Sequence, residues 1–439
     1  MIPLAAFLAA ATAAKIAWPL FSREPTARLT FLTVHLALAY WYWLPAANVL
    51  FVGQLGPENV IPDLQIAREA VWTVLIYQLS AIGALGALVL LFPERFKVAA
   101  SARLPALALG SLAFVGAGAF LGWSFRTEGI GLWLQLLTGR TSARELIDYY
   151  NFSTSIEQSL RALLEVVTVF LALVVLAHAS LERQMGRIAS VLGVLGITLV
   201  VVATGTRSPV LMAIFVVILG RLSGQALPPG PAKRRRAHFA LSAIVAAAIP
   251  IALTLSIRAA KTGMGDPVLS MVLVNNDMFR ELVYVKSQMA DFRQGNPVDF
   301  LLVPFTYMLP SFLGFVRQIP EHLLAFNGAR ANIDLILGSG NVFPGLIADN
   351  VLVFGSAGPL WFAASIVGFT LALRMLRNIA PIGTAGVAIQ VAASGFLFFS
   401  FRNVHPGLAL VLVWSAAGLW WLRAVQGRAQ TARPDANRP

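Results

Sequence analysis

Arg207 occupies an unusual position for a charged side chain. It lies in a short polar string, residues 204–209, between two apolar stretches, so we expect the chain to turn there between two helices. Helix ends leave backbone N–H groups without intrahelical partners, and an arginine beside such groups suits a phosphate. In the alternative interpretation, Arg207 extends to the membrane surface from a tight helical hairpin.

Other charged residues could act together with Arg207. The candidates include Asp277, Arg280, Arg317, His322 and Arg402. Asp277 and Glu281 are four residues apart, so on a helix they would share a face with Arg280 beside it. Taken alone, each of these residues also fits a solvated loop charge. Gathered on one side of the molecule, the guanidinium groups would bind a pyrophosphate, and a carboxylate or imidazole would serve as general base.

Several kinds of chemistry are excluded by the composition. The chain has no cysteine, which excludes disulfides, thiolate metal sites and thiol nucleophiles. The five histidines are scattered, and no two have the spacing of metal ligands. A glycine-rich phosphate loop of the Walker type is absent, which argues against an ATP-driven pump and a cytoplasmic nucleotide-sugar transferase. We therefore expect neither metal nor cofactor, and a donor that is already activated.

The elements that must position these residues are membrane-spanning helices. Of the 439 residues, 58% are hydrophobic and 12% are charged, against about 25% charged in a soluble domain. Long apolar runs predict an all-α polytopic membrane protein with about eleven spans, because a helix needs about 20 residues to cross the hydrocarbon core. The expected spans are residues 2–20, 29–50, 70–92, 105–123, 161–179, 188–204, 208–222, 238–257, 350–373, 381–400 and 406–422.

Basic residues concentrate in alternate loops, which predicts the orientation. The basic segments are 23–28, 95–103, 183–187, 221–236, 374–377 and the C-terminal tail. By the positive-inside rule these segments are cytoplasmic, which places the N-terminus outside and the C-terminus inside. Topology and attraction to anionic lipid then explain the net charge of +13, so we expect a lipid bilayer and no nucleic acid as partner. Carboxylates on the cytoplasmic side are few, namely Glu24, Glu94, Glu182 and Asp435, which leaves no obvious place for a metal-bound nucleotide.

Two long polar segments fall on the outer side, and function is expected there. These are residues 124–160 and 258–349. The second is too long for a passive connector and mixes charges with aromatic residues, so parts of it are expected to form amphipathic helices on the membrane surface. No internal repeat or low-complexity linker divides the chain, and we treat residues 1–439 as one membrane domain.

Three segments share their pattern with one known family. They are the turn Gly205 to Ser208, the aromatic-rich stretch 295–320, and a glycine-rich stretch, 338–358, which carries Asp349 and ends in Phe-Gly-x-x-Gly before a span. In these segments, and over about residues 188–410, the chain resembles the Wzy-type O-antigen and exopolysaccharide repeat-unit polymerases.

This resemblance implies an enzyme of the bacterial inner membrane. It would transfer a growing glycan from polyprenyl pyrophosphate to a sugar hydroxyl of the next lipid-linked repeat, at the periplasmic face and without metal or nucleotide. Arg207 and Arg280, followed by Arg317 and Arg402, would stabilise the departing pyrophosphate, and Asp277 or His322 would accept the proton. Lipid-linked oligosaccharides are the implied substrates, and chain-length regulators and flippases are the partner proteins to be considered.

Other functions remain open at this point. An O-antigen ligase would use the same donor but a different acceptor. A transporter or flippase would need ionisable residues along a pathway and an internal repeat, whereas only Lys15, His35 and Glu165 lie away from span ends. A non-catalytic subunit of a polysaccharide export machine would need none of the arginines.

Overall fold

The chain folds as a bundle of helices. The computed structural model describes residues 2–47, 50, 64–94, 105–137, 156–181, 187–204, 208–224, 278–287, 345–379, 384–401, 411–412, 415–416 and 420. The described residues contain helices and no strand, which confirms the all-α fold class. In chain order the helices are α1 (Ile2–Ser22), α2 (Pro25–Leu38), a π-helical segment (Ala39–Trp43), α3 (Leu44–Ala47), α4 (Leu64–Leu91), α5 (Ala106–Leu137), α7 (Ile156–Leu181), α8 (Arg187–Thr204), α9 (Ser208–Gly224), α12 (Met278–Ser287), α15 (Leu346–Phe354), a 3₁₀ turn (Gly355–Ala357), α16 (Gly358–Ile379) and α17 (Thr384–Ser400).

Most predicted spans coincide with helices. Helices occupy the first seven predicted spans, from 2–20 to 208–222, and also 350–373 and 381–400. Within the part of the chain that the structure describes, five segments are long and apolar enough to cross a membrane: residues 4–22, 65–91, 106–124, 163–181 and 346–377. The chain is thus an α-helical multi-pass membrane protein. The span 238–257 and most of 406–422 lie outside the described residues, so the total of about eleven stays a prediction.

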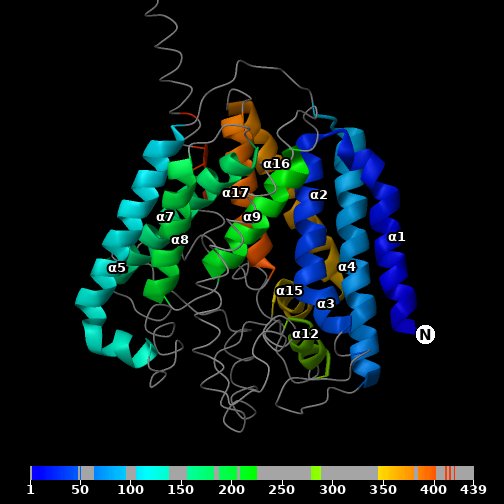
Figure 1. Ribbon diagram of the computed structural model, residues 1–439. Helices are drawn as coiled ribbons and strands as arrows, with labels where there is room; N and C mark the ends of the chain where they lie inside the picture. The colour runs from blue at the N-terminus through cyan, green and yellow to red at the C-terminus, as the bar shows by residue number, and fades with distance from the viewer. Residues whose placement is uncertain are drawn as a thin grey trace, which may run out of the picture.

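Two groups of helices meet along α9 and α17 (Figure 1). One group contains α1, α2, α4 and α16, and the other contains α5, α7 and α8; α17 packs against α7 and α9 on one side and α2 on the other. Every residue from 388 to 401 is buried, as expected for a helix that is apolar all round. Gly395 lets α17 and α9 approach closely, because a Cβ there would lie 2.8 Å from Val216 Cγ2.

The helices differ from the prediction in two places, one in a predicted loop and one in a predicted span. α5 continues to Leu137, well into the predicted loop 124–160, and Figure 1 shows its last turns bending away from the rest of the helix. The predicted span 350–373 is also interrupted, because Gly355 has φ +54° and separates α15 from α16. Within 258–349, α12 is a short helix that packs into the bundle and buries Glu281 together with its apolar residues, so amphipathic helices on the membrane surface remain a prediction for this segment.

Basic segments predicted to share a side meet at one end of the bundle where the structure describes them. The α1–α2 turn, the end of α4, the end of α9 and the last turns of α16 lie together at the upper end in Figure 1. Each belongs to a segment predicted to be cytoplasmic or directly adjoins one. The opposite end carries α3, α12 and α15 (Figure 1). Which end faces the cytoplasm is a prediction of the positive-inside rule.

Candidate functional site

The sequence-predicted site residues fall mainly outside the described part of the chain. This holds for Asp277, Arg207, Arg317, His322 and Arg402. Arg280 lies in α12, where its backbone is helical. The structure therefore does not test whether these six residues converge. It does describe a direct neighbour in the chain for three of them, because Ser208 follows Arg207, Met278 follows Asp277 and Phe401 precedes Arg402.

Segments far apart in sequence meet around the hydroxyl of Tyr42. This residue lies in the π-helical segment and is fully buried. Its Oη accepts a hydrogen bond from the backbone N–H of Ile347 at 3.0 Å and donates to the carbonyl of Phe401 at 3.3 Å. The N–H of Leu346 also donates to Phe401 O, at 3.1 Å. The start of α15 is thereby fixed against the end of α17, a contact that we call the Tyr42 junction.

Gly345 completes the Tyr42 junction and connects it to α12. Its φ of +83° strongly favours glycine, and a Cβ there would meet Met278 Sδ at 2.8 Å and Tyr42 Oη at 2.9 Å. At the start of α15, the amides of Leu346 and Ile347 are already hydrogen-bonded to the protein. These two amides are therefore occupied within the protein and are not free to bind an anion.

Two buried carboxylates lie on the helices that meet here. Glu281 of α12 is 0% exposed and Asp349 of α15 is 4% exposed, and the two helices pack against each other. Acidic side chains within apolar membrane segments are costly and are usually kept for function.

Asp349 is a functional candidate that the sequence analysis missed. It appeared there only as part of the glycine-rich pattern. The available signal was its position as the one acidic residue in the apolar helix Leu346–Phe354. Glu281 was likewise noted only as a neighbour of Asp277.

The π-helical segment is a second feature that the sequence analysis did not identify. Trp41 Nε1 donates to Phe398 O of α17 at 3.0 Å, and Trp43 Nε1 donates to Gln78 Oε1 of α4 at 2.8 Å. With Tyr42 between them, three consecutive aromatic residues form hydrogen bonds to α4, to α15 and to the end of α17. π-Helical turns often occur at functional sites, and here the turn directs the polar atoms of large rings into the core.

A hydrogen bond between side chains holds α12 on α4. Lys286 Nζ donates to Thr73 Oγ1 at 2.8 Å, and α12 buries its apolar side chains in the bundle. Burial lowers the pKa of Lys286, and the nearby carboxylate of Glu69 opposes that shift. Because Arg280 belongs to the same short helix, this contact fixes the backbone that carries Arg280.

The glycine motif before α16 has a steric cause. The helix begins at Gly358, as the Phe-Gly-x-x-Gly pattern predicts. A Cβ at Gly358 would collide with the hydroxyl of Tyr77 and lie 2.9 Å from the carbonyl of Asn350. The hydroxyl of Tyr77 is buried and has no hydrogen-bond partner among the described residues.

We expect Gly358→Ala to destabilise the protein by about 1–3 kcal/mol, since a well-packed site must shift to admit a methyl group. The measurement is the thermal unfolding midpoint in detergent. Gly368→Ala is the matched control on the same helix, because nothing lies within 4 Å of a Cβ at that position. Adding Tyr77→Phe to Gly358→Ala should recover part of the loss. Equal midpoints for the two alanine variants would contradict the steric explanation.

Comparisons with known proteins identify no relative: no protein family, curated protein or solved structure matches this chain. Among the described residues there is also no group of three histidine, aspartate or glutamate side chains placed to hold a metal ion. The site is therefore characterised by its own geometry, which is a buried, tightly hydrogen-bonded junction with carboxylates on two of its helices.

Proposed function

We propose that this protein polymerises oligosaccharide repeat units carried on polyprenyl pyrophosphate. The glycan would pass from its lipid carrier to a sugar hydroxyl of the next lipid-linked repeat. A new glycosidic bond forms, the bond from the sugar to the pyrophosphate breaks, and the acceptor proton goes to a protein base. The reaction belongs at the end of the bundle that carries α12 and α15, which is the periplasmic end under the predicted orientation.

The observation that carries this proposal is the Tyr42 junction. It brings together two segments that carry or border candidate site residues: α12, which contains Arg280 and starts directly after Asp277, and the end of α17, where Phe401 directly precedes Arg402. The glycine-rich stretch 338–358 is one of the three points of family resemblance. It contains α15, and α16 starts at its last residue, Gly358. A buried carboxylate within such a junction further supports a chemical role for this end.

The roles follow from the charges that develop in the reaction. Arg207 and Arg280, with Arg317 and Arg402, would stabilise the pyrophosphate as it leaves, because guanidinium groups form charge-assisted hydrogen bonds with phosphate oxygens. Asp277 and His322 are the sequence-derived candidates for the base. The burial of Asp349 supports adding it as a third candidate.

The test is glycan length on a gel, from cells that lack the gene and are complemented with defined variants. Arg207→Ala and Arg280→Ala should abolish long chains while single repeats still reach the cell surface. Arg23→Ala is the matched control, because Arg23 is exposed and lies in the α1–α2 turn at the other end of the bundle. Expression of each variant is measured in the same membranes.

The result would count against the proposal if deletion of the gene left chain length unchanged. Repeats that accumulate inside the deletion strain would instead indicate transport. A ligase would be indicated by two results together. Single repeats would stay on their lipid carrier at the outer face, and chains already polymerised would also fail to reach lipid A.

A further inference from the structure

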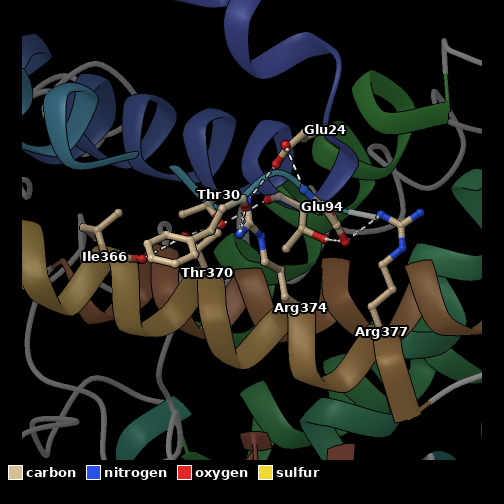
Figure 2. Close-up of polar contacts among 9 residues, drawn as sticks. Glu24, Thr30, Glu94, Ile366, Thr370, Arg374 and Arg377 are labelled. Atoms are coloured by element: carbon tan, nitrogen blue, oxygen red, sulfur yellow. Dashed lines mark hydrogen bonds and ion pairs between the residues drawn. The ribbon is translucent and has the colours of Figure 1, made fainter. Parts of the chain in front are cut away.

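Four charged side chains form two buried ion pairs at the end of the bundle opposite the Tyr42 junction (Figure 2). The guanidinium of Arg374 lies 2.7 Å from the carboxylate of Glu24, and that of Arg377 lies 3.1 Å from Glu94. Exposure of these side chains is between 8% and 12%. We call these four residues the ion-pair clamp.

Hydrogen bonds unite the two pairs into one network. Thr26 Oγ1 donates to Glu94 Oε1 at 2.9 Å, and the backbone N–H of Glu94 donates to Glu24 Oε1 at 3.0 Å. Arg374 Nη1 also donates to Phe92 O at 2.7 Å. The clamp therefore fastens together the α1–α2 turn, the end of α4 and the last turns of α16, as Figure 2 shows.

The contact between α2 and α16 continues deeper into the bundle. The hydroxyl oxygens of Thr30 and Thr370 lie 3.2 Å apart, and both residues are 0% exposed. On the other side of α2, the guanidinium of Arg28 donates to the carbonyls of Leu222 and Ser223 at the end of α9. Five helices, α1, α2, α4, α9 and α16, are thus tied at this end.

Opening this end would be unfavourable. Separating either pair within the bundle leaves a buried charge without its partner, which is strongly destabilising. A transporter that works by alternating access must open and close both ends in turn. An enzyme that meets its substrates at the outer face has no such need.

We infer that the clamp keeps this end closed throughout the working cycle, so that substrates reach the protein from the opposite end or laterally from lipid. The inference rests on the proposed function only for its activity readout. The contact between α2 and α16 can be tested independently of what the protein does.

The chain has no cysteine, so a cross-link can be introduced into the natural background. Thr30→Cys with Thr370→Cys is the pair to use, because the two hydroxyl oxygens are 3.2 Å apart and the side chains are therefore in direct contact across α2 and α16. Membranes are treated with an oxidant, and the loss of free thiols is measured after denaturation. Each single-cysteine variant serves as control.

We expect the disulfide to form in the folded protein, and glycan chain length to stay the same before and after oxidation. In working cells, the single Thr370→Cys thiol should resist a water-soluble maleimide until the protein is denatured. Labelling of this thiol in the native protein, or a folded double variant that does not cross-link, would overturn the inference.

Loss of activity on oxidation, if a reductant restores it, would also overturn the clamp inference. The location of the glycan would then show whether the proposed function fails as well. Single repeats at the surface would mean that the polymerase opens this end, so that only the clamp inference fails. Repeats trapped inside the cell would mean that both the inference and the proposed function fail.

Discussion

Arg374→Ala is expected to lower the free energy of unfolding by about 3–5 kcal/mol, the usual cost of removing one member of a buried ion pair. Glu24 would remain buried without its guanidinium partner, and Phe92 O would lose a hydrogen-bond donor. The measurement is unfolding of the purified protein in detergent, by heat or by titration with denaturant.

A double variant separates the cost of an unpaired charge from the cost of lost packing. Arg374→Met combined with Glu24→Gln keeps the volumes similar and removes both charges, so it should be more stable than Arg374→Ala. The amide oxygen introduced by Glu24→Gln can still accept from the backbone N–H of Glu94, as the carboxylate does. A double variant no more stable than the single one would show that the ion pair is not the source of the effect.

Asp349→Asn is expected to abolish long glycan chains without destabilising the protein. Asparagine has nearly the shape of aspartate but cannot accept the acceptor proton as a carboxylate does, and a general base contributes about 10²–10⁴-fold to a rate. Burial disfavours a charged carboxylate, so a neutral amide of similar shape at this position should leave stability unchanged or raise it. Chain length on a gel and the thermal midpoint of the purified variant check the two parts of this prediction.

Increased stability with lost activity is typical of residues that are retained for function. Asn350→Ala is the neighbouring control, because Asn350 is also buried but its described hydrogen bond stays within its own helix, to Leu346 O. Normal chains from Asp349→Asn would remove Asp349 from the site and leave Asp277 and His322 as the candidate bases. A collapsed midpoint would show that the carboxylate is structural.

The positions of most described helices could be predicted from the sequence for simple physical reasons. A run of about 20 apolar residues has one low-energy arrangement in a bilayer, so α1, α4 and α7 follow from composition. Alternation of the loops then required Glu24 and Glu94 to share a side with Arg374 and Arg377, and the structure pairs them. The sequence did not predict which carboxylate pairs with which arginine, since that depends on how the helices pack.

Features that depend on distant contacts were not predicted. The lack of a side chain at Gly358, where α16 starts, matters because Tyr77 and the carbonyl of Asn350 lie against it. The role of Tyr42 depends on Ile347 and Phe401, both from the other end of the chain. Asp349 was overlooked for the same reason, because a single acid in an apolar run becomes a candidate only when its burial is known. Of the predicted site, Arg280 alone lies within a described element.

The central position of α17 has a consequence for biosynthesis. Trp41 in the π-helical segment donates to Phe398, a residue 357 positions later in the chain. At about 5–20 residues per second, the ribosome takes roughly 18–70 s to make the intervening chain. During that time α2 and its neighbours must wait in the membrane with their inner surfaces uncovered. The bundle can close only when α17 arrives, so assembly of the core is expected to be a late event that follows insertion of the earlier helices.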